Sequence, residues 1–99
     1  MAKKFKVYIS KSAQNDLEHF FFYISADSIS NAKKFILELE KKIYCLDKLP
    51  ERFAYIPENL YFGTEYRHIT YKKYRVIYKI EAFSVYILRV IHSSKLLDL

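Results

Sequence analysis

The sequence predicts an α+β fold: an N-terminal strand and an antiparallel helical hairpin, then three antiparallel strands that complete a roughly four-stranded sheet. Two observations lead to this prediction. One short segment of alternating apolar and polar residues precedes two stretches with helical periodicity. Three more alternating segments then follow, joined by only about two to four residues, which suits antiparallel hairpins and excludes parallel crossovers between them.

The first predicted elements are a half-buried strand and an amphipathic helix. Phe5, Val7 and Ile9 alternate with polar or exposed positions, as in a strand with one buried face. Ser10 or Ser12 can cap a helix from about residue 11 to residue 26. Its apolar residues recur every three or four positions, at Ala13, Leu17, Phe20, Phe21 and Ile24.

The second helix has the clearest periodicity. Ser28 or Ser30 can cap it, and Leu49-Pro50 ends it. Its apolar stripe consists of Ala32, Phe35, Ile36, Leu39, Ile43 and Leu46, and most of its lysines lie off that stripe. Because about four residues join the two helices, we expect them to pack as an antiparallel hairpin against one face of an antiparallel sheet.

The remaining strands are expected at about residues 65–70, 74–81 and 85–91, after an irregular segment from residue 51 to residue 63. The hairpin can cover only one face of the sheet, so the other face, here called the outer face, is expected to meet solvent or a partner. Alternation assigns six residues to that outer face: Arg75, Ile77, Lys79, Ile87, Arg89 and Ile91.

Composition adds limits on the class of protein. The chain has 99 residues and a net charge of +6, so we expect one domain spanning residues 1–99 and attraction to polyanions such as nucleic acid or acidic protein segments. No run approaches the roughly 20 apolar residues of a membrane span, and no signal peptide is recognisable, so we expect a cytoplasmic protein without membrane contact.

Metal and cofactor chemistry are not expected. Cys45 is the single cysteine and fits a packed helical position. His19 and His68 have no neighbour at the spacing of metal ligands, and there is no glycine-rich phosphate loop.

Motifs along the whole chain resemble one family. The second half contains Tyr66-Arg67-His68-Ile69, then Tyr74-Arg75-Val76-Ile77-Tyr78, then the segment from Val85 to His92, and the first half adds Ile9-Ser10-x-x-Ala13 and Leu-Pro-Glu-Arg-Phe. In order and spacing these motifs resemble the RelE/ParE superfamily of type II toxins, which includes plasmid stabilisation toxins, and are more similar to its ParE-like members. The resemblance implies a cytoplasmic toxin that a cognate antitoxin holds inactive in an oligomeric complex.

The superfamily implies two possible targets. RelE-like members are ribosome-dependent mRNA endonucleases, and the resemblance would give Arg67, Arg75 and His92 catalytic roles, with His92 as proton carrier because its pKa is ordinarily about 6.5. ParE-like members inhibit DNA gyrase. Ile69, Ser93 and Leu99 stand where the nucleases have a lysine, an arginine and a tyrosine, so we expect a gyrase inhibitor.

Alternatives remain open beside this expectation. The chain could be the mRNA endonuclease, or a degenerate member that binds its antitoxin and has little toxicity. Arg75 could be an ion-paired strand residue and His92 a structural histidine. The expected surface for target or antitoxin comprises Lys72, Lys73, Arg75, Ile77, Lys79, Ile87, Arg89 and Lys95.

Overall fold

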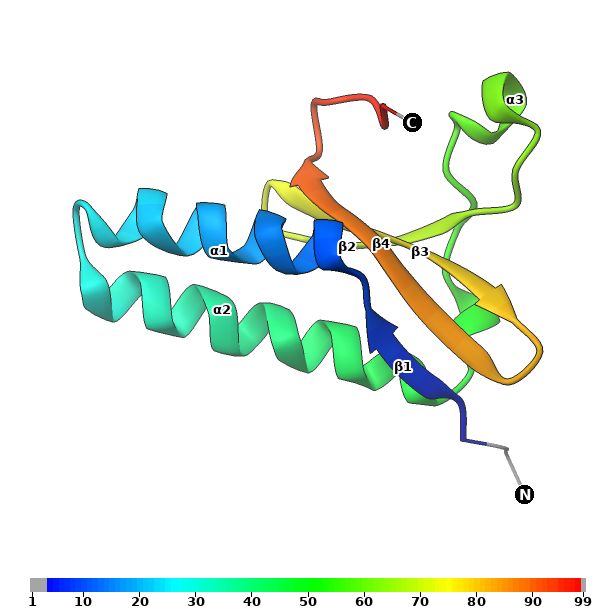
Figure 1. The fold of residues 1–99 in the computed structure, drawn as a ribbon, viewed down its shortest axis with the longest axis horizontal. Coiled ribbons are helices and arrows are strands. Elements are labelled where there is room, and N and C mark those ends of the chain that lie inside the picture. The colour runs from blue at the N-terminus through cyan, green and yellow to red at the C-terminus, as the bar shows by residue number, and fades with distance from the viewer. Residues whose placement is uncertain (1–3, 99) are drawn as a thin grey trace.

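The structure is a computed structural model that describes residues 4–98 (Figure 1). Two long helices and a four-stranded sheet form its frame, with short helical turns at Cys45–Asp47 and Pro50–Arg52. The elements in chain order are β1 (Lys6–Ile9), α1 (Lys11–Ser25), α2 (Ile29–Tyr44), α3 (Asn59–Phe62), β2 (Arg67–Tyr71), β3 (Tyr74–Glu81) and β4 (Ser84–His92). The predicted class and element order are therefore confirmed.

The strand order is β1-β4-β3-β2, and β1 corrects one expectation. β2, β3 and β4 are antiparallel neighbours as predicted, but β1 runs parallel to β4, with Lys6 opposite Ser84 and Ile9 opposite Ile87. The expectation of a fully antiparallel sheet was wrong because alternation identifies a strand without its direction. The long excursion through both helices lets the chain return in either sense.

Serine caps fix the start of both long helices, and of the two candidates predicted for each helix the first one, Ser10 or Ser28, is the cap. Ser10 Oγ accepts a hydrogen bond from the Ala13 N–H at 3.1 Å, and Ser28 Oγ accepts one from the Asn31 N–H at 3.1 Å. The Ser10 hydroxyl also donates to the Leu88 carbonyl at 3.1 Å, which ties the start of α1 to β4. The hairpin is thereby positioned against one face of the sheet (Figure 1).

The main core lies between the hairpin and the sheet. The α2 stripe supplies Phe35, Leu39 and Ile43, and the sheet supplies Val76, Tyr78, Val85, Ile87 and Val90. Tyr78 is completely buried, and its hydroxyl donates to the Pro50 carbonyl at 2.6 Å. Burial raises the pKa of the Tyr78 phenol well above its usual range, so it stays protonated.

The outer face is not open, contrary to the expectation from the sequence. Ile56, Ile77, Ile91 and Leu97 form a second buried cluster there, with Tyr66 and Leu88 packed against it. The irregular segment before β2 and the C-terminal tail supply Ile56 and Leu97, so these two segments fold over the sheet. Burial of these apolar side chains stabilises the covered arrangement, and the alternation within a strand does not reveal it.

A β-bulge in β4 changes which residues share a face. Ile77 is opposite Arg89, whereas the next residue, Tyr78, is opposite Ile87, so Leu88 is an extra residue. An inserted residue shifts the alternation by one position. Ile87 consequently packs in the main core beneath the helices, and its assignment to the outer face was wrong.

Candidate functional site

The centre of the outer face is a buried ion pair between Arg75 of β3 and Glu58. The two side chains are only 5% and 3% exposed. Arg75 Nη1 donates to Glu58 Oε1 at 3.1 Å, and Arg75 Nη2 donates to Glu58 Oε2 and, at 2.7 Å, to the Lys95 carbonyl. Glu58 Oε2 also accepts the Leu97 N–H at 2.8 Å. The pair joins the strand, the irregular segment and the C-terminal tail.

Protonation in this site follows from the same contacts. The hydrogen bond from Arg75 lowers the pKa of Glu58 from 4.5 to about 2, against the opposing effect of burial. Burial, and then the positive charge of Arg75, lowers the pKa of His68. His68 Nδ1 lies 3.3 Å from Arg75 Nη1, and a guanidinium can only donate, so the neutral imidazole accepts here.

A pocket of about 210 Å³ lies beside this pair. His68, Thr70, Arg75, Ser93 and Lys95 contribute polar groups to its lining. Arg75 Nε is buried and has no hydrogen-bond partner among residues 4–98. The guanidinium beside the pocket therefore has its charge balanced by Glu58, and its Nε lies beneath the surface.

Arg67 binds the backbone of the irregular segment before β2. Its Nη1 donates to the carbonyls of Glu51 and Phe53, at 2.7 and 2.6 Å, and its guanidinium carbon lies 4.0 Å from the Tyr55 ring centre. Cross-strand pairing with Tyr78 puts Arg67 on the helix-facing side of the sheet, opposite to Arg75. The structure does not bring these two arginines together.

His92 also lies away from Arg75. It is paired with Tyr74 on the helix-facing side, and the two rings are 5.6 Å apart. His92 Nδ1 is within 2.7 Å of the Ser94 hydroxyl and accepts the Ser94 N–H at 3.2 Å. The three residues named for a nuclease therefore do not converge on one centre.

The other expected cations also have separate neighbours. Lys79 pairs with Glu81 at 2.8 Å, which raises the pKa of the lysine, and Lys72 lies 4.0 Å from Glu38. Lys73 is exposed beside Lys72 in the β2–β3 turn, and exposed Lys95 borders the pocket at Arg75. Ile77 and Ile87 are fully buried and so present no surface.

Arg89 is bound by Asp16 of α1. Its Nε and Nη2 donate to the two carboxylate oxygens at 2.8 and 3.0 Å, and this hydrogen bonding raises the pKa of the arginine. Asp16 also accepts the Val90 N–H at 2.9 Å, beyond the end of the β1–β4 pairing. One carboxylate thus satisfies a strand amide that β1 does not reach.

Sequence reasoning missed Glu58 and Asp16. Glu58 lies in the irregular segment 17 residues before its arginine, and Asp16 is 73 residues before Arg89. Neither spacing corresponds to a local motif. A charged residue next to Pro57 was the only available signal for Glu58, and it does not name a partner.

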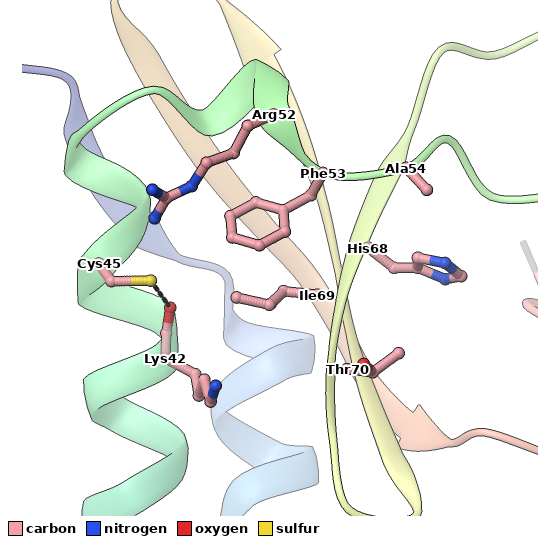
Figure 2. A pocket seen from close by; sticks show the side chains of 8 residues that line it. All are labelled: Lys42, Cys45, Arg52, Phe53, Ala54, His68, Ile69 and Thr70. Atoms are coloured by element: carbon pink, nitrogen blue, oxygen red, sulfur yellow. Dashed lines mark hydrogen bonds between the residues drawn. The ribbon is translucent and has the colours of Figure 1, made fainter.

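A basic pocket of about 430 Å³ lies beside the outer edge of β2, as Figure 2 shows. Lys42 and Arg52 border it, and Cys45, Phe53 and Ile69 form its less polar wall. The Cys45 thiol donates to the Lys42 carbonyl at 2.9 Å. Within residues 4–98, no three His, Cys, Asp or Glu side chains gather as metal ligands.

Comparison with known families identifies the family of the chain. Residues 7–97 match the family described as ParE toxin of the type II toxin–antitoxin system, parDE. The chain belongs to this family. It is therefore the toxin component of a type II toxin–antitoxin system, and the resemblance in the sequence is confirmed. No curated protein sequence matches the toxin.

Solved structures share the fold of the toxin. A chain of the chromosomal ParDE system from P. aeruginosa is 14% identical with a TM-score of 0.71, over 90% of the toxin and 96% of that chain. A chain of the RelBE2 toxin–antitoxin complex from Mycobacterium tuberculosis is 18% identical with a TM-score of 0.69, over 94% and 95%. Among its described residues the toxin has no helix long and apolar enough to cross a membrane.

Proposed function

We propose that the toxin inhibits DNA gyrase in the cytoplasm and that a cognate antitoxin neutralises it. The observation that carries the gyrase proposal is that the three residues expected to be catalytic in a nuclease have other partners or lie apart. Arg75 is charge-balanced by buried Glu58, Arg67 is bound to two backbone carbonyls, and His92 lies on the other side of the sheet from Arg75. Cleavage of RNA needs a base, an acid and free cations around one phosphate.

The antitoxin proposal is supported by the surface of the helical hairpin. Phe22, Tyr23, Ile29, Leu37 and Tyr44 are large apolar side chains exposed on α1 and α2. Exposed lysines of α2 flank them, at positions 33, 34, 41 and 42. An acidic amphipathic segment would cover the apolar groups and match the charges. Both solved structures cited above come from toxin–antitoxin systems.

The proposal is tested with purified components. The toxin should inhibit supercoiling by gyrase and leave mRNA intact in a translating extract, and an equimolar antitoxin should abolish the inhibition. As control, the Glu58→Leu/Arg75→Met double variant removes the guanidinium together with its counter-ion and should still inhibit gyrase. Unimpaired supercoiling with codon-phased mRNA cuts would reject gyrase as the target.

The second candidate function is a ribosome-dependent mRNA endonuclease. The pocket beside Arg75 favours it, since Lys95 is exposed at its border and its amine could contact a phosphate there. In this case the Glu58→Leu/Arg75→Met variant would lose mRNA cleavage. A degenerate toxin would instead bind the antitoxin, and its expression alone would leave growth and mRNA unchanged.

A further inference from the structure

An apolar knob at α3 projects from the molecule. Leu60 and Tyr61 are 91% and 86% exposed, and Phe62 and Tyr55 beside them are also exposed. We call Tyr55 and Leu60–Phe62 the α3 knob. In Figure 1 it lies at the opposite end of the long axis from the loop between α1 and α2. Its exposed side chains add almost nothing to the stability of the folded chain, because folding leaves them in water.

The base of the knob is held in place, although its tip is exposed. Asn59 Oδ1 accepts the Thr64 hydroxyl at 2.7 Å and the Tyr66 N–H at 3.0 Å, and Asn59 Nδ2 donates to the Tyr66 carbonyl at 2.9 Å. Gly63 ends the helical turn with φ +65°, a conformation that glycine adopts without strain. Glu58, which precedes the turn, is fixed by Arg75. A rigid base lowers the entropic cost of binding through the tip.

Charge narrows the class of partner. All 17 Lys and Arg residues lie outside residues 53–66, and the acidic residues inside that segment are Glu58, already paired, and Glu65. Arg67 at the base of the knob donates to backbone carbonyls. The tip of the knob, Leu60–Phe62, carries no basic side chain, and the Arg67 guanidinium lies against the Tyr55 ring at its base. Such a tip is unsuited to nucleic acid or anionic lipid, which both depend on Lys and Arg. It suits an apolar groove on a protein, with a neutral or basic rim.

We propose that the α3 knob inserts into an apolar groove of the toxin's protein target, at a site separate from the antitoxin surface on the hairpin. This inference rests on the proposed function, in which the target is a protein. Large aromatic and apolar anchors at the centre of an interface carry most of its binding energy. The proposed acidic segment of the antitoxin would instead meet the exposed lysines of α2, in the helical hairpin whose α1–α2 loop lies farthest from α3 (Figure 1).

The test compares Leu60→Ser, the double variant Leu60→Ser/Tyr61→Ser and the matched control Leu96→Ser, which alters another highly exposed leucine. Affinity for purified gyrase, inhibition of supercoiling, growth arrest at equal expression and antitoxin binding are measured for each. The double variant should lose roughly thirtyfold or more in affinity for gyrase and should no longer arrest growth. Its antitoxin affinity and thermal midpoint should match those of the wild type, and Leu96→Ser should behave as wild type throughout.

The outcomes separate the knob from the identity of the target. Gyrase inhibition by the double variant within about threefold of wild type would overturn the role of the knob alone. If the wild-type chain arrests growth without affecting gyrase, only the identification of gyrase as the target is overturned. Loss of that arrest in the double variant would still support binding of the target by the α3 knob. Growth arrest retained by the double variant would reject the role of the α3 knob. Co-sedimentation of wild type, but not the double variant, with vesicles of neutral phospholipid would assign the knob to a lipid surface and overturn the proposal. A chain that neither inhibits gyrase nor arrests growth would overturn both.

Discussion

The Arg75 guanidinium and the Glu58 carboxylate form a nearly inaccessible ion pair, although 17 residues separate them in the chain. The pair also binds the backbone at Lys95 and Leu97. It therefore fastens two segments over the outer face of the sheet, and it engages the arginine to which the resemblance to RelE-like nucleases assigns a catalytic role. The same contact should therefore influence stability, and it supports the proposed gyrase target over a nuclease.

Removal of the Arg75 side chain should destabilise the folded toxin. Arg75→Ala leaves the Glu58 carboxylate buried without its counter-ion, and we expect a loss of about 3–5 kcal/mol in the free energy of unfolding. Urea titration followed by circular dichroism measures it. Lys79→Ala, at an exposed ion pair, is the control and should leave the urea midpoint unchanged. A midpoint for Arg75→Ala equal to that of the control would contradict a structural role.

Joint replacement should separate stability from activity. In Glu58→Leu/Arg75→Met no charge is left buried, so the double variant should recover most of the stability that Arg75→Ala loses. Its growth arrest then reports on chemistry and not on unfolding. We expect the arrest to persist, as measured by colony counts after induction. A stable double variant without toxicity would point to a catalytic arginine.

Acid should weaken the toxin through Glu58. The pKa of Glu58 is lowered in the folded state to about 2 from 4.5, so its contribution is complete above pH 4.5 and disappears as the pH falls toward 2. The loss over that window should be about 3 kcal/mol, since each pKa unit corresponds to about 1.4 kcal/mol. Urea titrations at several pH values measure the slope. Glu58→Gln should flatten it, and an unchanged slope in that variant would assign the acid sensitivity to other groups.

Asp16 should contribute more to the stability of the fold than its partner Arg89. Asp16→Ala removes the acceptor of the Val90 N–H as well as the ion pair, so we expect a cost of roughly 1–3 kcal/mol. Arg89→Ala leaves that backbone contact intact and should cost less, because the arginine is partly exposed. Hydrogen exchange at the Val90 amide distinguishes the two variants. Faster exchange only in Arg89→Ala would reverse this ranking.

The hydroxyl of Tyr78 should stabilise the fold through its hydrogen bond to the Pro50 carbonyl. Tyr78→Phe preserves the buried ring but leaves the Pro50 carbonyl without its donor, which should cost about 1–2 kcal/mol. Thermal unfolding compared with Tyr8→Phe, at an exposed tyrosine, measures the difference. Equal midpoints for the two variants would show that water replaces the lost bond.

The β4 strand illustrates a limit of pattern reading. Alternation correctly assigned Arg75, Ile77 and Lys79 of β3 to the outer face, because that strand is regular. In β4 the same rule failed at Ile87, because Leu88 is an extra residue in the pairing. A bulge is defined by the partner strand, so the residues of β4 alone do not reveal it.

The amino-acid sequence by itself determined the order of the strands and long helices, a serine cap within two candidate positions for each long helix, the antiparallel pairing of β2 to β4 and the family. These features depend on neighbours a few residues apart, whose periodicity and hydrogen-bonding groups can be read locally. Only the tertiary structure decided the parallel direction of β1, the covered outer face and the partners Glu58 and Asp16. Each of these arises between groups distant in the chain, where burial and charge select a partner that sequence spacing does not specify.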